Sequence, residues 1–86
     1  MSLREQFLDA LIDGRLGRGG LVSRGEFMAL FREEKKTYTG VFLSNSEMRT
    51  GHHSPTYHHF TIRVSKGIYR VDPEAILERR RARGLI

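Results

Sequence analysis

The segment FTIRVSKGIYRV, residues 60–71, constrains the fold of this chain more than any other stretch. Apolar residues at positions 60, 62 and 64 alternate with polar ones, which is the period of a half-buried β-strand. A second β-rich run, residues 68–71, follows Ser65-Lys66-Gly67, where Gly67 can adopt the positive φ of a tight turn. The segment therefore predicts a β-hairpin.

An amphipathic helix and a very short strand are expected near the start of the chain. Residues 3–12 place apolar side chains at the three- and four-residue spacing of one helix face. Gly14 and the glycine-rich stretch RLGRGG that follows end this helix and turn the chain. Leu21 and Val22 are then expected to form a short strand.

A second helix is expected over SRGEFMALFREE, residues 23–34. Ser23 and Glu26 have the spacing of a capping box, in which each side chain satisfies a backbone donor of the other residue. Phe27, Leu30 and Phe31 form the buried stripe, and the charged residues that follow form an exposed helix end.

A third helix is expected to begin a few residues later and to extend to Gly51. Thr37 or Thr39 would cap its start, although the Thr, Gly, Ser and Asn residues within it lower the helix propensity. The residues assigned to its buried face are Tyr38, Val41, Phe42 and Met48. Two amphipathic helices this close together have the spacing of a helix-turn-helix pair.

After the hairpin, Asp72 and Pro73 provide an N-cap and a first-turn proline for EAILERRRARG, and Gly84 ends this helix. Its apolar anchors are Ala75, Ile76 and Leu77. Its basic run, Arg79, Arg80, Arg81 and Arg83, could bind a nucleic-acid backbone, mediate association, or lie solvated against Glu74 and Glu78. We predict one domain, residues 1–86, in which residues 73–86 form a basic C-terminal helix.

The distribution of charge favours a polyanionic partner. The net charge is +5, and residues 49–86 hold eight Lys/Arg against three Asp/Glu, whereas residues 1–48 hold seven of each. There is no cysteine, no continuous apolar run at the start, and no stretch of membrane-spanning length. We therefore expect a cytoplasmic protein that does not bind membranes. Association with the nucleoid is compatible with this expectation.

The expected order of helix, short strand, helix, helix and hairpin resembles the winged helix-turn-helix superfamily over roughly residues 3–72. The hairpin segment, with its Val-x-Lys-Gly-x-Tyr pattern, is similar to the wing of small winged-helix domains attached to restriction and chromatin proteins. The resemblance implies an α+β fold of three helices, a hairpin and a short C-terminal helix. It also implies duplex DNA binding, with the third helix in the major groove and the wing against the backbone or minor groove. Residues 49–59 are longer than the corresponding segment of many relatives.

Two groups of residues are candidates for DNA contact. On the third helix, the candidates for base or phosphate contact are Thr39, Ser44, Asn45 and Arg49. The alternative is that Ser44 and Asn45 only cap or interrupt a poor helix. On the hairpin, the candidates for phosphate contact are Arg63, Lys66 and Arg70, because phosphate binding needs only charge and reach.

All four histidines of the chain lie in the stretch GHHSPTYHH, residues 51–59. Metal binding would need several of them to converge on one ion with a carboxylate such as Glu47 or Asp72, and adjacent histidines point in different directions. The spacing of the two His-x-Ser/Thr motifs also differs from that of two-histidine phosphoesterases, and the chain is short of a catalytic pocket. We therefore assign no metal, cofactor or catalytic residue. We expect instead that His52, His53 and Thr56 donate hydrogen bonds to phosphate oxygens, the alternative being a solvated surface loop.

These observations predict a small basic protein that binds duplex DNA, in preference to RNA, through the third helix, the 49–59 segment and the hairpin. The first alternative is a protein-interaction or dimerisation module, such as a homodimer. The second is an RNA-binding protein, and the third is a metal-dependent hydrolase.

Overall fold

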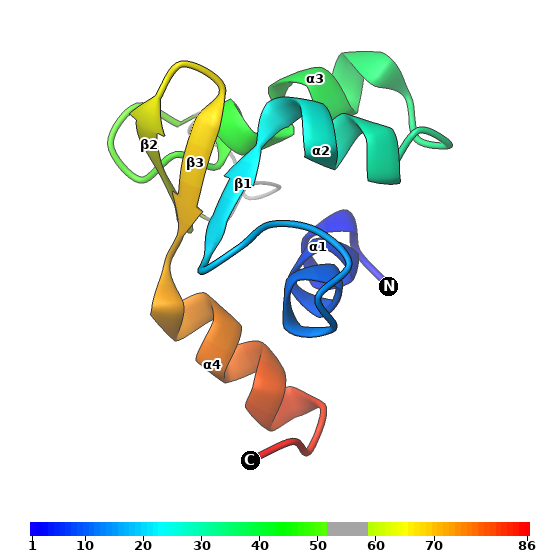
Figure 1. Ribbon diagram of the computed structural model, residues 1–86, viewed down its shortest axis with the longest axis vertical. Coiled ribbons are helices and arrows are strands. Elements are labelled where there is room, and N and C mark those ends of the chain that lie inside the picture. Colours follow the sequence, from blue (N-terminus) through cyan, green and yellow to red (C-terminus); the bar gives the residue numbers. More distant parts are fainter. Residues whose placement is uncertain (52–58) are drawn as a thin grey trace.

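The computed structural model describes residues 1–51 and 59–86. In chain order, its elements are α1 (Leu3–Ile12), β1 (Leu21–Ser23), α2 (Arg24–Leu30), α3 (Lys36–Asn45), β2 (Thr61–Ser65), β3 (Ile68–Val71) and α4 (Pro73–Ala82). The strands form one antiparallel sheet in the order β1-β3-β2, with α1, α2 and α3 on one side of it and α4 leading away from β3 (Figure 1). The described part of the chain is therefore a small α+β fold with four helices and a three-stranded antiparallel sheet.

Four phenylalanines at the centre of the core join three helices to the chain just before β2. Phe7, from α1, meets Phe27, from α2, edge to face, with ring centroids 5.1 Å apart. Phe42, from α3, stacks on Phe27 at 5.2 Å, and the Phe60 ring lies 6.0 Å from that of Phe7. All four rings are at most 3% exposed, so apolar burial and ring contacts fix the positions of the helices around the sheet.

The local sequence signals placed most elements correctly. The first helix, the short strand and the hairpin occupy the expected residues, and Gly67 has a φ of 72° in the hairpin turn. The capping box between Ser23 and Glu26 is present at the start of α2, and Asp72 caps α4 with Pro73 in its first turn. The helix α4 ends at Ala82, just before Gly84, which has a φ of 72°.

The second helix is shorter than expected. It ends at Leu30, and the charged residues that follow form turns instead of a helix end. The C-cap residue Phe31 is only 8% exposed, and its ring lies 5.0 Å from that of Phe27. The chain therefore leaves the helix where the Phe31 side chain turns into the core.

The expected start and end of the third helix were both wrong. The helix α3 begins at Lys36, and its N-cap Lys35 makes no side-chain capping bond, so neither threonine caps it. It ends at Asn45 because the next residues bind the strand β2: the Ser46 carbonyl accepts the Phe60 and Thr61 amides, and the Met48 amide donates to the Thr61 carbonyl.

None of the helices that the structure describes has the length and the apolar composition of a membrane-spanning segment.

Candidate nucleic-acid interface

The exposed side of α3 is rotated about the helix axis from the side that the sequence predicts. Thr39 is 2% exposed and its hydroxyl bonds to the Lys35 carbonyl, so the prediction that Thr39 contacts DNA is wrong. Conversely Val41 and Met48, which the apolar pattern assigns to the buried face, are each 41% exposed. The buried face is formed by Thr39, Phe42 and Leu43 with the half-buried Tyr38.

The exposed residues of α3 are Lys36, Thr37, Val41 and Ser44. Thr37, Val41 and Ser44 follow one another at intervals of four and three residues, and Lys36 lies two four-residue steps before Ser44. All four residues therefore lie along one side of the helix. The Ser44 hydroxyl donates to the Val41 carbonyl, and Asn45 is half-buried. Only Ser44, among the predicted contacts within α3, is therefore fully on the surface. Lys36 and Thr37 were missed, although they share its helical spacing.

Glu47 joins the end of α3 to the hairpin. Glu47 is only 3% exposed, and its carboxylate accepts the amides of Arg49, Thr50 (2.9 Å) and Arg63 (3.0 Å). The Arg49 guanidinium lies 3.6 Å away. Burial alone would raise the pKa of the Glu47 carboxyl, but the three amides and the Arg49 charge outweigh it and lower the pKa to about 2.

This arrangement brings two of the predicted contacts, Arg49 and Arg63, to one place. Both residues are exposed and bind the Glu47 carboxylate, Arg49 through its amide and its guanidinium, and Arg63 through its amide. Arg70 lies elsewhere: it is opposite Leu21 and Ile62 on the neighbouring strands, whereas Arg63 is opposite the buried Tyr69. Since successive residues of a strand point to opposite faces, Arg70 is on the outer face of the sheet and Arg63 is not.

Arg24, which the sequence patterns did not single out, connects the hairpin turn to α3. Its backbone amide donates to the Gly67 carbonyl (2.8 Å), and its Nε donates to the Gly40 carbonyl (2.8 Å). Lys66, at the tip of the hairpin, is exposed directly beside Gly67. No short-range pattern predicts this contact, because residues 24 and 40 belong to different helices.

Two of the four arginines in the C-terminal basic run are paired with acidic residues at α1. The Arg79 Nε and Nη2 bind both oxygens of Asp9, at 2.7 and 2.9 Å, and its Nη1 lies 3.0 Å from Glu5. Arg83 lies 3.1 Å from Asp13 and 3.5 Å from Asp9. The alternative in which these arginines lie solvated against the acids of their own helix is therefore wrong for both. Arg80 and Arg81 remain exposed.

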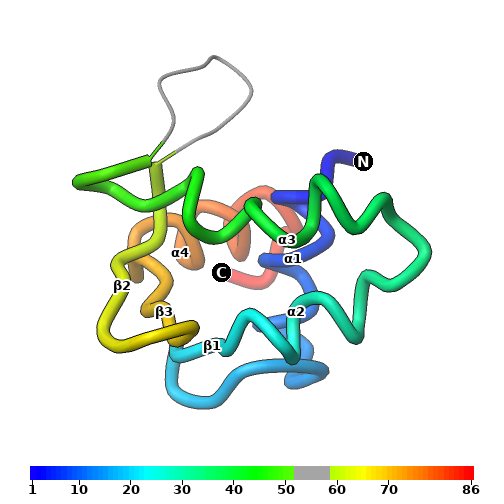
Figure 2. The backbone as a smooth tube through the Cα atoms, turned by 90° about the horizontal axis from the view of Figure 1, so that it is seen from above, coloured from blue at the N-terminus to red at the C-terminus, as the bar shows by residue number. Residues whose placement is uncertain are grey.

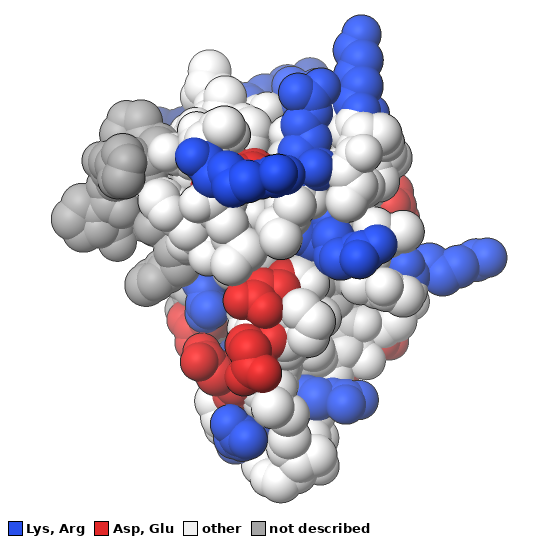
Figure 3. Space-filling view, turned by 90° about the vertical axis from the view of Figure 1, so that its left-hand side faces the viewer, with Lys and Arg blue, Asp and Glu red and all other residues white. Residues whose placement is uncertain are grey.

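Lys and Arg side chains gather at the end of the molecule that carries the hairpin turn. Figure 3 shows them over the upper half of the face on the sheet side, while most of the Asp and Glu atoms lie below. Seen from above, α2, α3 and the hairpin lie in front and α4 lies behind (Figure 2). The hairpin turn and α3 are thus at the basic end.

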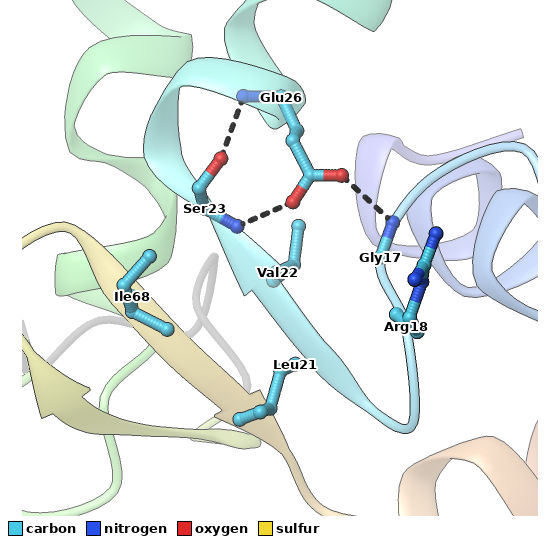
Figure 4. Close-up of a pocket in the computed structure, with 7 residues that line it drawn as sticks. All are labelled: Gly17, Arg18, Leu21, Val22, Ser23, Glu26 and Ile68. Atoms are coloured by element: carbon cyan, nitrogen blue, oxygen red, sulfur yellow. Dashed lines mark hydrogen bonds between the residues drawn. The ribbon is translucent and has the colours of Figure 1, made fainter.

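A pocket of about 430 Å³ lies between β1, the start of α2 and the preceding glycine-rich loop (Figure 4). Its only carboxylate is that of Glu26, which accepts the amides of Ser23 (2.9 Å) and Gly17 (3.1 Å). These backbone hydrogen bonds, first that from Ser23, lower the pKa of Glu26. Both oxygens of this carboxylate are therefore already engaged by backbone donors.

The remaining predicted contacts, His52, His53 and Thr56, lie outside the described residues. Within residues 1–51 and 59–86, no group of three or more His, Asp or Glu side chains could hold a metal ion. Comparison of the chain with protein-family models, with curated proteins and with solved structures finds no match.

Proposed function

We propose that this chain is a small winged helix-turn-helix protein that binds duplex DNA. The order α1-β1-α2-α3-β2-β3 and the sheet order β1-β3-β2 support the proposal, because a winged-helix domain also has a hairpin after its second and third helices. The proposal rests above all on charge: residues 24–71, from α2 to the end of the hairpin, hold eight Lys/Arg against four Asp/Glu. The rest of the chain holds seven against six.

In this proposal the exposed side of α3 enters the major groove. Ser44 and Asn45 lie toward its C-terminal end, where Asn45 has the side chain suited to an adenine edge. Arg49, Arg63 and Lys66 contact phosphates on the hairpin side of α3 and position the protein without reading sequence. Arg70, on the outer face of the sheet, contributes to the positive electrostatic potential of the protein and makes no direct contact with DNA.

The proposal is tested by fluorescence anisotropy with duplex DNA, single-stranded DNA and RNA of equal length over a salt series. Duplex DNA is expected to bind most tightly, with an affinity that falls steeply as salt rises. The double variant R63Q/K66Q should reduce the slope of log affinity against log salt by about 1.8, because each phosphate that is no longer neutralised lowers it by about 0.9. The matched control R80Q/R81Q removes the same charge from α4 and should change the slope little. A wild-type affinity for duplex DNA that does not change with salt would exclude the proposal, and tighter binding of RNA would favour the RNA-binding alternative.

A protein-interaction module is the second candidate, and the outer face of the sheet favours it. Leu21, Ile62 and Ile68 are only half-buried there, around the exposed Arg70. Half-buried apolar residues on a sheet face are a common feature of association surfaces. Light scattering that shows a stable oligomer, together with no shift of random duplex DNA, would favour this candidate over DNA binding.

A further inference from the structure

The Arg24 side chain is held in one orientation at the surface. Its Nε donates to the carbonyl of Gly40, in the middle of α3, at 2.8 Å. Its backbone amide is fixed to the hairpin turn through the Gly67 carbonyl, also at 2.8 Å. The residue is therefore attached at both ends, to the two elements that the proposed function brings to DNA.

The rest of the guanidinium is available to a ligand. Arg24 is exposed, and among the described residues no carboxylate or other acceptor binds its Nη1 or Nη2. An arginine whose Nε is already bound loses less side-chain freedom when its remaining N–H groups bind a phosphate. Two N–H groups on one side of the fork match two phosphate oxygens.

Gly40 is what allows this arrangement. A Cβ atom at position 40 would lie 3.0 Å from Arg24 Nη2 and 3.8 Å from the Met28 methyl group. The missing side chain therefore leaves room for the guanidinium against the backbone of α3. The same distances show that a methyl group at this position would point toward α2 and not toward the exposed side of α3.

We propose that the Arg24 guanidinium binds a backbone phosphate of duplex DNA where α2, α3 and the hairpin turn meet. A duplex that receives α3 in its major groove must carry its phosphate backbone past the junction between α3 and the hairpin, where Arg24 and Lys66 are exposed. This assignment rests on the proposed function and adds to it a contact that is fixed before DNA arrives.

The first test compares R24K, R24Q and the wild type by anisotropy on one duplex over a salt series. R24Q should weaken binding by about tenfold at low salt and lower the salt slope by about 0.9. R24K keeps the charge but loses the Nε hydrogen bond and the planar fork, so it should keep the slope and still bind more weakly. The control R80Q removes one exposed charge from α4 and should match the wild type.

The second test uses Gly40→Ala, which keeps every charge. The added methyl group should displace the guanidinium from its position and weaken DNA binding by a few-fold, without a loss of thermal stability, because alanine is the better helix former. Circular dichroism checks that each variant is folded. If the wild type binds duplex DNA while R24Q retains its affinity and slope, the Arg24 assignment is wrong and the proposed function stands. If the wild type does not bind duplex DNA, both are wrong.

Discussion

The Glu47 carboxylate, buried between the end of α3 and the strand β2, is held by backbone donors rather than by a single ion pair. Three amides and the Arg49 guanidinium surround it. By accepting the Arg63 amide, it satisfies a donor on the outer side of the edge strand β2, where a neighbouring strand would otherwise bind. Glu47 therefore stabilises both the exit from α3 and the edge of the sheet.

Replacing Glu47 with Gln should destabilise the protein by about 3 kcal/mol at pH 7. The reason is that an amide cannot accept all three N–H groups and carries no charge. Folding lowers the pKa of Glu47 from 4.5 to about 2. The stabilisation by the ionised carboxylate is therefore complete above pH 4.5 and is lost as the pH falls through the folded pKa of about 2. Urea unfolding of the wild type and of the Glu47→Gln variant should be measured at pH 7, 4.5 and 2.5. The difference between their unfolding free energies should become smaller from pH 4.5 to pH 2.5.

Glu34→Gln is the matched control, because Glu34 is exposed and no ion pair or side-chain hydrogen bond is formed by it among the described residues. It should change the unfolding free energy by less than about 0.5 kcal/mol at each pH. Equal stability of the Glu47 and Glu34 variants at pH 7 would show that the buried carboxylate contributes nothing.

The phase of α3 shows why single residues are harder to predict than elements. The apolar pattern places Val41 in the core and Thr39 on the surface, and the structure reverses both. Thr39 can be buried because its hydroxyl is satisfied within the helix by the Lys35 carbonyl. In a helix with this many small polar residues, the apolar pattern alone does not fix which side faces the core.

At the scale of elements, local interactions explain what could be predicted. The hairpin, the capping box of α2 and the start of α4 depend on contacts within a few residues, and all three were found where expected. The end of α3 depends on Thr61, and the position of Arg24 depends on Gly40, each more than ten residues away. Such contacts form only in the folded chain, so no short sequence pattern contains them.

Two glycines provide a test of the hairpin turn. Gly67 has a φ of 72° with open space around it, so Gly67→Ala should cost about 1 kcal/mol through backbone strain alone. Gly67→Asn should cost less, because asparagine tolerates this conformation. Gly25→Ala, in α2, should instead stabilise the protein by about 0.5 kcal/mol. Thermal unfolding of the three variants should give opposite signs for the two positions, and the same sign at both would contradict the turn geometry.

The contact between α1 and α4 gives a second prediction at this scale. Asp9 binds Arg79 through two hydrogen bonds, and these bonds, opposed by burial, lower the pKa of Asp9. Arg79→Gln should lower the urea midpoint, and high salt should reduce the difference from the wild type. Arg80→Gln, one residue along and exposed, should leave the midpoint unchanged. Equal midpoints for the two variants would show that the ion pairs do not hold α4.

At the scale of the whole molecule, the ion pairs between α1 and α4 change how the basic sequence is interpreted. Four arginines in the last helix and at its C-cap suggest a cationic tail, but two of them, Arg79 and Arg83, are matched by acidic residues of α1 and its C-cap. Among the described residues, the exposed cations that form no ion pair include Arg24, Lys36, Arg63, Lys66 and Arg70 around α2, α3 and the hairpin, as well as Arg80 and Arg81 on α4. The net charge predicts a polyanionic partner, but only the packing of the helices shows which arginines are left to meet it.

The histidines give a prediction that concerns this overall charge. Between pH 7 and about pH 5.5, the carboxyls of Glu5, Asp9, Glu26 and Glu47 remain ionised because their pKa values are lowered. The chain also has four histidines, and histidine is the side-chain type that ordinarily gains positive charge over this pH range. Duplex DNA affinity should therefore rise by about tenfold over this range, with a steeper salt dependence. A variant with all four histidines replaced by Gln, a side chain that cannot gain a charge, should show a flat pH profile. A wild-type profile that is equally flat would show that the stretch from 51 to 59 does not contact DNA.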